Sequence, residues 1–171
     1  YADYALWQRE FTKSPAFDQD LAYWKKQLEG PLPVLEMPLD FPRPKVQTWD
    51  GARVRHTLDP RLFSRISDLA QQLNVTPFVV LLAGWQALLY RYTGQEDSVI
   101  GAALAGRDRL EWEALVGFFV NTVALRTRLG SDLAFQRLVE RVQSATLGAQ
   151  DHQEAPFERV VAEVQHDRDL A

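Results

Sequence analysis

The feature that most constrains this sequence is a helical segment, Pro77 to Tyr90, that is apolar nearly all the way round. Thr76 and Pro77 supply the cap and the first-turn proline with which helices begin, and Gly94 supplies a stop. A helix without a polar face must be covered on more than one side. The segment is shorter than the ~20 residues of a membrane span, and Gln86 interrupts it. We therefore expect the central helix of a folded core and no membrane span.

The overall composition is that of an ordinary globular domain. The 171 residues include 19 Lys and Arg against 23 Asp and Glu, a net charge of −4, and 46% are hydrophobic. A mildly acidic chain without a basic run argues against nucleic-acid binding, which requires clustered Lys and Arg. Cysteine is absent, which excludes disulfides and thiolate metal sites. This absence and the lack of a secretion signal lead us to expect a cytoplasmic protein.

Hydrophobic periodicity predicts many helices and few strands. Strands are expected over 52–58, 97–104 and 118–129. Helices are expected over 4–11, 20–28, 60–73, 77–90, 110–116 and 157–164, with a further long helix capped by Ser131 and Asp132. This order predicts an α/β fold, or an α+β fold with helices on one sheet face. Three strands make a small sheet, which leaves room for strands that would complete it.

One long irregular stretch, 30–50, contains five prolines. Loops of this length in a compact domain usually have a function or lie fixed across a surface. A solvated linker between two domains is the alternative. Its apolar residues favour an extended segment packed on the domain, namely Leu32, Val34, Leu35, Met37, Leu39 and Phe41.

The sequence contains no complete catalytic constellation. The histidines, His56, His152 and His166, are not spaced as metal ligands, so no metal site is expected. The serines lack the context of a hydrolase nucleophile, and the glycines form no phosphate-binding loop. Glu111 and Glu113 face different directions on a helix and are most simply solvated surface charges.

Three segments are unusual. Asn121 lies in the clearest strand, although Asn is depleted in strands, and a buried Asn usually has specific partners. The polar loop at the start of 152–158 precedes a helix. Arg107 follows Gly106 just past a strand end, from which it can reach another part of the fold.

Together with three further segments, these resemble the condensation domain of nonribosomal peptide synthetases. The opening YADYALWQRE, with Tyr1, Asp3 and Trp7, is similar to that family's Tyr-x-Asp-Tyr-Ala-x-Trp motif. The stretch 38–44, which includes Arg43, is similar to its Pro-x-Asp-x-Pro-Arg-Pro motif.

Three more motifs follow in the family's order. VGFFVNTVALR at 116–126 matches (Val/Ile)-Gly-x-Phe-Val-Asn-Thr and a closing Arg, through Gly117, Phe119, Asn121, Thr122 and Arg126. HQEAPFE at 152–158 matches His-Gln-x-x-Pro-Phe-Glu, with Glu154 where Asp is more usual, through His152, Gln153, Pro156 and Phe157. Residues 168–170 resemble the start of Arg-Asp-x-Ser-Arg. The motifs span the whole chain.

The resemblance implies a two-layer α/β sandwich, one half of a chloramphenicol-acetyltransferase-like fold. The family's catalytic motif, His-His-x-x-x-Asp-Gly, is missing here; in the family it lies just before the position where this chain begins. Residues 1–171 are therefore expected to form most of the C-terminal lobe. The N-terminal lobe and the last strands would be absent, so the fold would be incomplete at both ends.

The implied function is peptide-bond formation in secondary-metabolite biosynthesis. A donor thioester and an acceptor amine would arrive on the phosphopantetheine arms of two carrier domains, with an adenylation domain adjoining. No cofactor would bind this chain directly, no catalytic residue would lie in it, and the chain alone would be inactive. Arg107 resembles the family arginine that forms a salt bridge with the Asp of the missing motif. Gly117, Phe119, Asn121 and Thr122 would form tunnel wall or structural support.

Other functions remain open. An epimerising or terminal variant of the same family would share these motifs. A docking module that only binds carrier domains is a non-catalytic alternative, and a degraded His-His-x-x-x-Asp-Gly ahead of Tyr1 in the parent polypeptide would favour it. A free-standing acyltransferase of the acetyltransferase-like fold would need its own His-x-x-x-Asp, which is absent.

Overall fold

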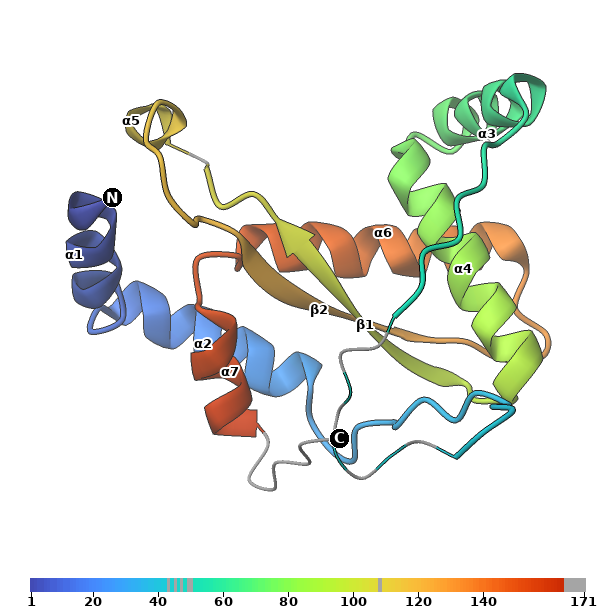
Figure 1. The fold of residues 1–171 in the computed structure, drawn as a ribbon, viewed down its shortest axis with the longest axis horizontal. Coiled ribbons are helices and arrows are strands. Elements are labelled where there is room, and N and C mark those ends of the chain that lie inside the picture. The colour runs from blue at the N-terminus through green and yellow to red at the C-terminus, as the bar shows by residue number, and fades with distance from the viewer. Residues whose placement is uncertain (43, 45, 47, 49–50, 108, 165–171) are drawn as a thin grey trace. The chain divides into compact units, whose positions relative to one another are not determined.

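The computed structural model describes residues 1–42, 44, 46, 48, 51–107 and 109–164 (Figure 1). Arg43 and the motif at 168–170 lie outside the described residues. The elements are α1 (Ala2–Phe11), α2 (Pro15–Gln27), α3 (Pro60–Gln72), α4 (Pro77–Thr93), β1 (Asp97–Leu104), α5 (Leu110–Glu113), β2 (Asn121–Arg128), α6 (Phe135–Asp151) and α7 (Phe157–Val164).

The described residues form one two-stranded sheet, in which β1 pairs with β2. The predicted strand at 52–58 is wrong: these residues have no regular structure and are exposed, Val54 to 93%. Their alternating pattern suits a strand, but a strand is stable only when a neighbour pairs with it. Several element boundaries also differ from the prediction; α5, for example, ends at Glu113 rather than 116. β2 begins at Asn121 rather than 118, and α6 begins at Phe135, beyond the predicted Ser131 cap.

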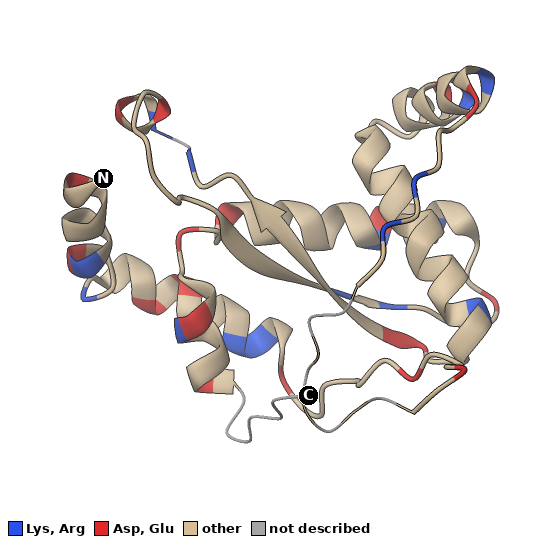
Figure 2. Cartoon of the chain, in the orientation of Figure 1, with Lys and Arg blue, Asp and Glu red and all other residues tan. Residues whose placement is uncertain are grey.

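The chain divides into two compact units. Of the described residues, the first contains those in Tyr1–Pro33, Val99–Arg126 and 145–164, and the second contains those in Val34–Ser98 and Thr127–Ser144. Lys and Arg are spread over several elements rather than gathered on one of them (Figure 2).

The first unit has an aromatic and aliphatic core. α2 begins at Pro15, where the Ser14 side chain accepts a hydrogen bond from the Phe17 N–H at 3.3 Å. This cap starts the helix earlier than the periodicity predicts, because it satisfies an N–H that has no partner inside the helix. α2 packs against α7. The buried apolar side chains include Phe11, Phe17, Trp24, Trp112, Phe119, Val123, Leu125, Ala155 and Val160.

The second unit is built around α4, which packs against α3. The capping prediction is confirmed: the Thr76 hydroxyl accepts from the Val79 N–H, and Gly94 ends the helix at φ 70°. That left-handed conformation suits glycine, which has no Cβ. One face of α4 is buried through Val79, Val80, Leu82, Ala83, Gln86 and Leu89.

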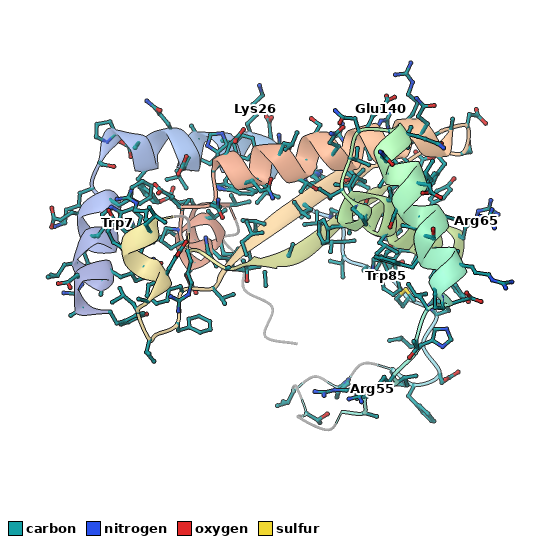
Figure 3. All side chains as sticks on the ribbon, turned by 90° about the horizontal axis from the view of Figure 1, so that it is seen from above. Trp7, Lys26, Arg55, Arg65, Trp85 and Glu140 are labelled. Carbon is teal, nitrogen blue, oxygen red and sulfur yellow. The ribbon has the colours of Figure 1, made fainter. Side chains whose placement is uncertain are left out.

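The other face of α4 is exposed. Among the residues that the structure describes, its large apolar side chains stay 43–61% exposed, so full cover on more than one side is not observed. Trp85 is labelled on this helix in Figure 3. The other large apolar side chains on the exposed face of α4 are those of Phe78, Leu81, Leu88 and Tyr92. Within the described ranges, no single helix has the length and composition of a membrane span; only α3 and α4 taken together reach them, and that pair bends by 105°.

The proline-rich stretch is held through its main chain rather than through apolar packing. The Gln95 side chain donates to the Val34 carbonyl at 2.8 Å and accepts from the Glu36 N–H at 2.9 Å. The predicted apolar packing is wrong for Val34, Leu35, Leu39 and Phe41, which are exposed, whereas Leu32 and Met37 are half-buried. An extended chain with frequent prolines cannot turn all its side chains to one surface.

Candidate functional site

Three sequence motifs meet at one pocket in the first unit. α1 contributes its exposed start, the segment between β1 and β2 contributes the opposite wall, and the loop after α6 closes the side. The lining includes Tyr1, Tyr4, Trp7, Trp112, Phe119, Asn121, Thr122, Gln153, Glu154, Pro156 and Phe157. Asp3 is exposed and does not line the pocket.

Aromatic rings make up one wall of the pocket. Tyr4 lies at the centre, with ring centroids 4.7 Å from Phe119 and 5.0 Å from Trp112. Trp7 meets Trp112 at 4.7 Å, and Figure 3 shows Trp7 on the side of α1 that faces α5. The Tyr1 hydroxyl donates to the Phe118 carbonyl at 3.0 Å. These contacts fix α1 against the strand-to-strand segment, since aromatic pairs stabilise beyond the area they bury.

Two glycines permit this close packing. Gly106 has φ 60°, and a Cβ there would overlap the Phe119 carbonyl. A Cβ on Gly117 would overlap the Tyr1 ring. The glycine of the 116–126 motif therefore makes room for the tyrosine of the first motif.

Asn121 joins β2 to the loop before α7. Its amide nitrogen donates to the carbonyls of Gln153 and Ala155, both at 2.8 Å. Its oxygen accepts from the N–H of Phe157 at 3.1 Å and from the N–H of Thr122 at 3.0 Å. The prediction of a hydrogen-bonded Asn121 is confirmed. The amide uses both donors and both acceptor positions, which is its full capacity.

Arg107 is half-buried against its own segment. Its Nη1 donates to the carbonyls of Trp112 and Glu113, and the guanidinium lies 4.1 Å over the Phe119 ring. Carbonyls at the end of α5 and the face of the Phe119 ring both attract the guanidinium back onto its own segment.

Arg109 is a site residue that sequence reasoning missed. Its guanidinium lies 4.5 Å from the Trp7 ring and 4.9 Å from the Trp112 ring, and it pairs with Glu154 at 3.4 Å. Only the fold brings these residues together. The weak signal in the sequence is a second arginine close to Arg107.

Arg126 holds the end of α2. It donates to the carbonyls of Gln27 at 3.3 Å and Glu29 at 2.8 Å, and to that of Pro31 at 3.5 Å. Carbonyls at a helix C-terminus have no partners inside the helix and attract cations. The closing arginine of its motif is thus structural here.

His152 lies next to the pocket and contacts α2. Its Nδ1 is 2.7 Å from Asp20 Oδ1, and its ring stacks on Tyr23 at 4.0 Å. Burial, and secondarily the charge of Asp151, raises the pKa of Tyr23 above its usual value. Both causes favour the neutral phenol.

The pocket is suited to binding and positioning. Its described lining contains aromatic rings, amides, carboxylates and the Thr122 hydroxyl, but no His, Lys or Ser. The described residues also contain no group of three or more His, Asp and Glu that could hold a metal ion.

An exposed apolar patch adjoins the pocket. It consists of Leu110, Val116, Phe118 and Val120, and Val116 is 94% exposed. Within 117–121, Phe118 and Val120 are exposed while Phe119 between them is buried. Four large exposed apolar side chains within the short segment 110–120 make it a candidate site of interaction.

Comparison with known proteins identifies the family. A family model described as the condensation domain matches residues 1–171. A linear gramicidin synthase polypeptide of Brevibacillus parabrevis is 46% identical over 171 residues, which is 100% of this chain and 3% of that protein. The chain therefore spans a small fraction of the length of this relative.

Two solved structures share the fold. The condensation domain from Monacolin K polyketide synthase MokA matches with a TM-score of 0.88 and 28% identity, over 98% of this chain and 40% of that one. The X-domain solved in complex with OxyB from teicoplanin biosynthesis matches with a TM-score of 0.91 and 26% identity, over 99% and 38%. These likenesses confirm the predicted fold class. With the match of the family model to the whole sequence, they establish that this chain belongs to the condensation-domain family.

Proposed function

We propose that this chain is the C-terminal lobe of a condensation domain that forms amide bonds in nonribosomal peptide synthesis. The observation that carries the proposal is the convergence of three family motifs on one pocket whose described lining contains no histidine. A donor thioester and an acceptor amine would be presented on the phosphopantetheine arms of two carrier domains.

The chemistry requires a part that this chain lacks. The acceptor nitrogen attacks the thioester carbonyl, the C–N bond forms, the C–S bond breaks, and a proton lost by the nitrogen ends on the sulfur, so that the pantetheine leaves as a thiol. Holding two tethered reactants together supplies much of the rate. The His of the family's His-His-x-x-x-Asp-Gly motif, on the other lobe, would assist the amine. The coverage of 40% of a solved condensation domain supports this division, because it leaves ample chain for the other lobe.

The apolar patch of Leu110, Val116, Phe118 and Val120 is the proposed contact with the other lobe. Arg107 would contribute a salt bridge to the Asp of that motif. The hydrogen bonds described for Arg107 use Nη1 alone, and a guanidinium has five N–H donors. Nη2 and Nε therefore suit a carboxylate from the other lobe.

A peptide-forming assay with loaded donor and acceptor carriers tests the function. The parent domain is expected to release the condensed product, and the 171-residue chain alone is expected to release none. Turnover by the isolated chain would contradict the lobe assignment. An inactive parent domain with an intact His-His-x-x-x-Asp-Gly would contradict the function.

A non-catalytic docking module is the second candidate. The observation in its favour is the likeness to the X-domain that was solved in complex with OxyB. A parent domain that retains partner proteins on a column but never condenses carrier-bound substrates would support it. The same assay, with the configuration of the carrier-bound amino acid also measured, distinguishes an epimerising variant of the family from a condensing one.

A further inference from the structure

The loop between α6 and α7, residues 152–156, is irregular yet forms one side of the pocket. An irregular loop has no ladder of backbone hydrogen bonds, so other groups must fix it. Asn121 holds its middle through the carbonyls of Gln153 and Ala155, both at 2.8 Å. The beginning of the loop needs a separate support, and α2 provides it.

One face of α2 contacts His152 in three ways. Asp20 accepts a hydrogen bond from the ring at 2.7 Å, Tyr23 stacks on the ring at 4.0 Å, and the Trp24 indole N–H donates to the His152 carbonyl at 3.0 Å. Residues separated by three and four positions lie on the same helix face, so α2 presents all three contacts together. Trp24 is 2% exposed, which makes this face a rigid support.

The contact between Asp20 and His152 is directional and shielded. The two side chains are 14% and 29% exposed, respectively. An ionised carboxylate only accepts hydrogen bonds, so Nδ1 of His152 carries the proton in this pair. The contact therefore fixes the rotation and the tautomer of the ring as well as its position.

We propose that Asp20 and His152 form a positioning pair that places Gln153 and Glu154 in the pocket wall. Both follow His152 directly, both line the pocket, and Glu154 pairs with Arg109 at 3.4 Å. Release of the ring from Asp20 frees the first residue of the loop, and Gln153 and Glu154 move with it. Asp20 belongs to none of the family motifs quoted above, and its described side-chain hydrogen bond goes to His152, so its role is exerted through that residue. The consequence for substrate rests on the function proposed above.

The test compares two amides at position 152 in the parent synthetase. H152N places an amide N–H where Nδ1 lies and keeps the donor to Asp20, whereas H152Q places it near Nε2 and loses that geometry. With H152Q and with D20A, we expect the KM for the acceptor carrier to rise about tenfold, with kcat within about twofold; a tenfold change corresponds to about 1.4 kcal/mol. H152N should stay within about twofold of the wild type in both constants. The matched control is E10Q, a carboxylate-to-amide change in the exposed Glu10–Lys13 ion pair on α1.

Hydrogen exchange supplies a readout that does not depend on activity. The backbone N–H groups of Gln153, Glu154, Ala155 and Phe157 should exchange faster in H152Q and D20A and at the wild-type rate in H152N and E10Q. Equal exchange in H152Q and H152N, or an unchanged KM in both H152Q and D20A, would overturn the positioning pair. If the parent protein forms no peptide bond but exchange follows this pattern, the proposed function fails while the pair stands.

Discussion

The backbone N–H of Phe157, the first residue of α7, donates a hydrogen bond to the side-chain oxygen of Asn121 at 3.1 Å. A residue of β2 thus caps a helix that lies 36 positions further along the chain. The first N–H groups of a helix have no partners inside it, and such a cap satisfies one of them. This contact unites two motifs that are distant in the sequence.

Replacement of Asn121 by alanine should destabilise the chain by about 2–3 kcal/mol, because two carbonyls and two N–H groups lose their partner. N121D should be no better, since a carboxylate cannot donate to the carbonyls of Gln153 and Ala155. Urea unfolding measures the loss of stability in both variants. As a control, Q136A on the exposed face of α6 should change stability by less than about 0.5 kcal/mol. Equal midpoints for N121A and Q136A would contradict the structural role.

Replacing Gly106 or Gly84 with alanine should change the stability of the protein in opposite directions. G106A should destabilise by more than about 2 kcal/mol, because φ is 60° there and the Cβ would overlap the Phe119 carbonyl. G84A should stabilise by about 0.5–1 kcal/mol, because Gly84 lies within α4 with nothing within 4 Å of a Cβ. Thermal unfolding of the two variants decides the matter, and a stabilising G106A would refute the close approach.

Tyr23 should make the chain less stable in alkali. Its pKa is raised in the folded protein, so the unfolded chain loses the phenolic proton first as the pH rises. Stability from Tyr23 is therefore complete below the unfolded pKa of about 10 and is lost as the pH climbs toward the folded value. Urea midpoints measured from pH 8 to pH 11 should fall more steeply for the wild type than for Y23F. Parallel curves would show that the phenol has the same pKa in both states.

The apolar patch should matter to the parent domain and not to the isolated chain. V116D should leave the unfolding free energy of the chain within about 0.5 kcal/mol of the wild type, since Val116 is 94% exposed. In the parent domain V116D should reduce condensation and lower the melting temperature. L6D, at an exposed apolar position of α1 outside the patch, is the comparison. A parent domain indifferent to V116D would place the lobe contact elsewhere.

Arg107 should contribute differently in the two contexts. In the isolated chain R107A removes two carbonyl contacts and the stacking on Phe119, a loss of about 1–2 kcal/mol. In the parent domain R107A would also leave the interlobe Asp unpaired, for a loss on the order of 3–5 kcal/mol if that pair is buried. Denaturant unfolding of both proteins gives the difference. Equal losses would argue that Arg107 serves its own segment alone.

Local sequence was sufficient where the determinants of structure are neighbours in the chain. The bounds of β1 agree with the prediction, and α3 and α4 begin at the predicted Asp59–Pro60 and Thr76–Pro77 signals. Caps, first-turn prolines and a left-handed Gly94 act within a few residues, so one sequence displays them. Asn121 was also predictable as a bonded residue, because its type is unusual in a strand.

The family, the class of fold and the motif residues could thus be predicted from the sequence by itself. Which residues share the pocket was decided only by the tertiary structure. Arg109 meets Trp7, and Asp20 meets His152, across more than 100 positions of sequence in each case. The alternating pattern at 52–58 likewise formed no strand without a described neighbour to pair with it. Hydrogen bonds and ring contacts between distant segments depend on how the chain is folded in three dimensions. Local periodicity reports only on residues that are neighbours in the sequence, so it cannot predict these contacts.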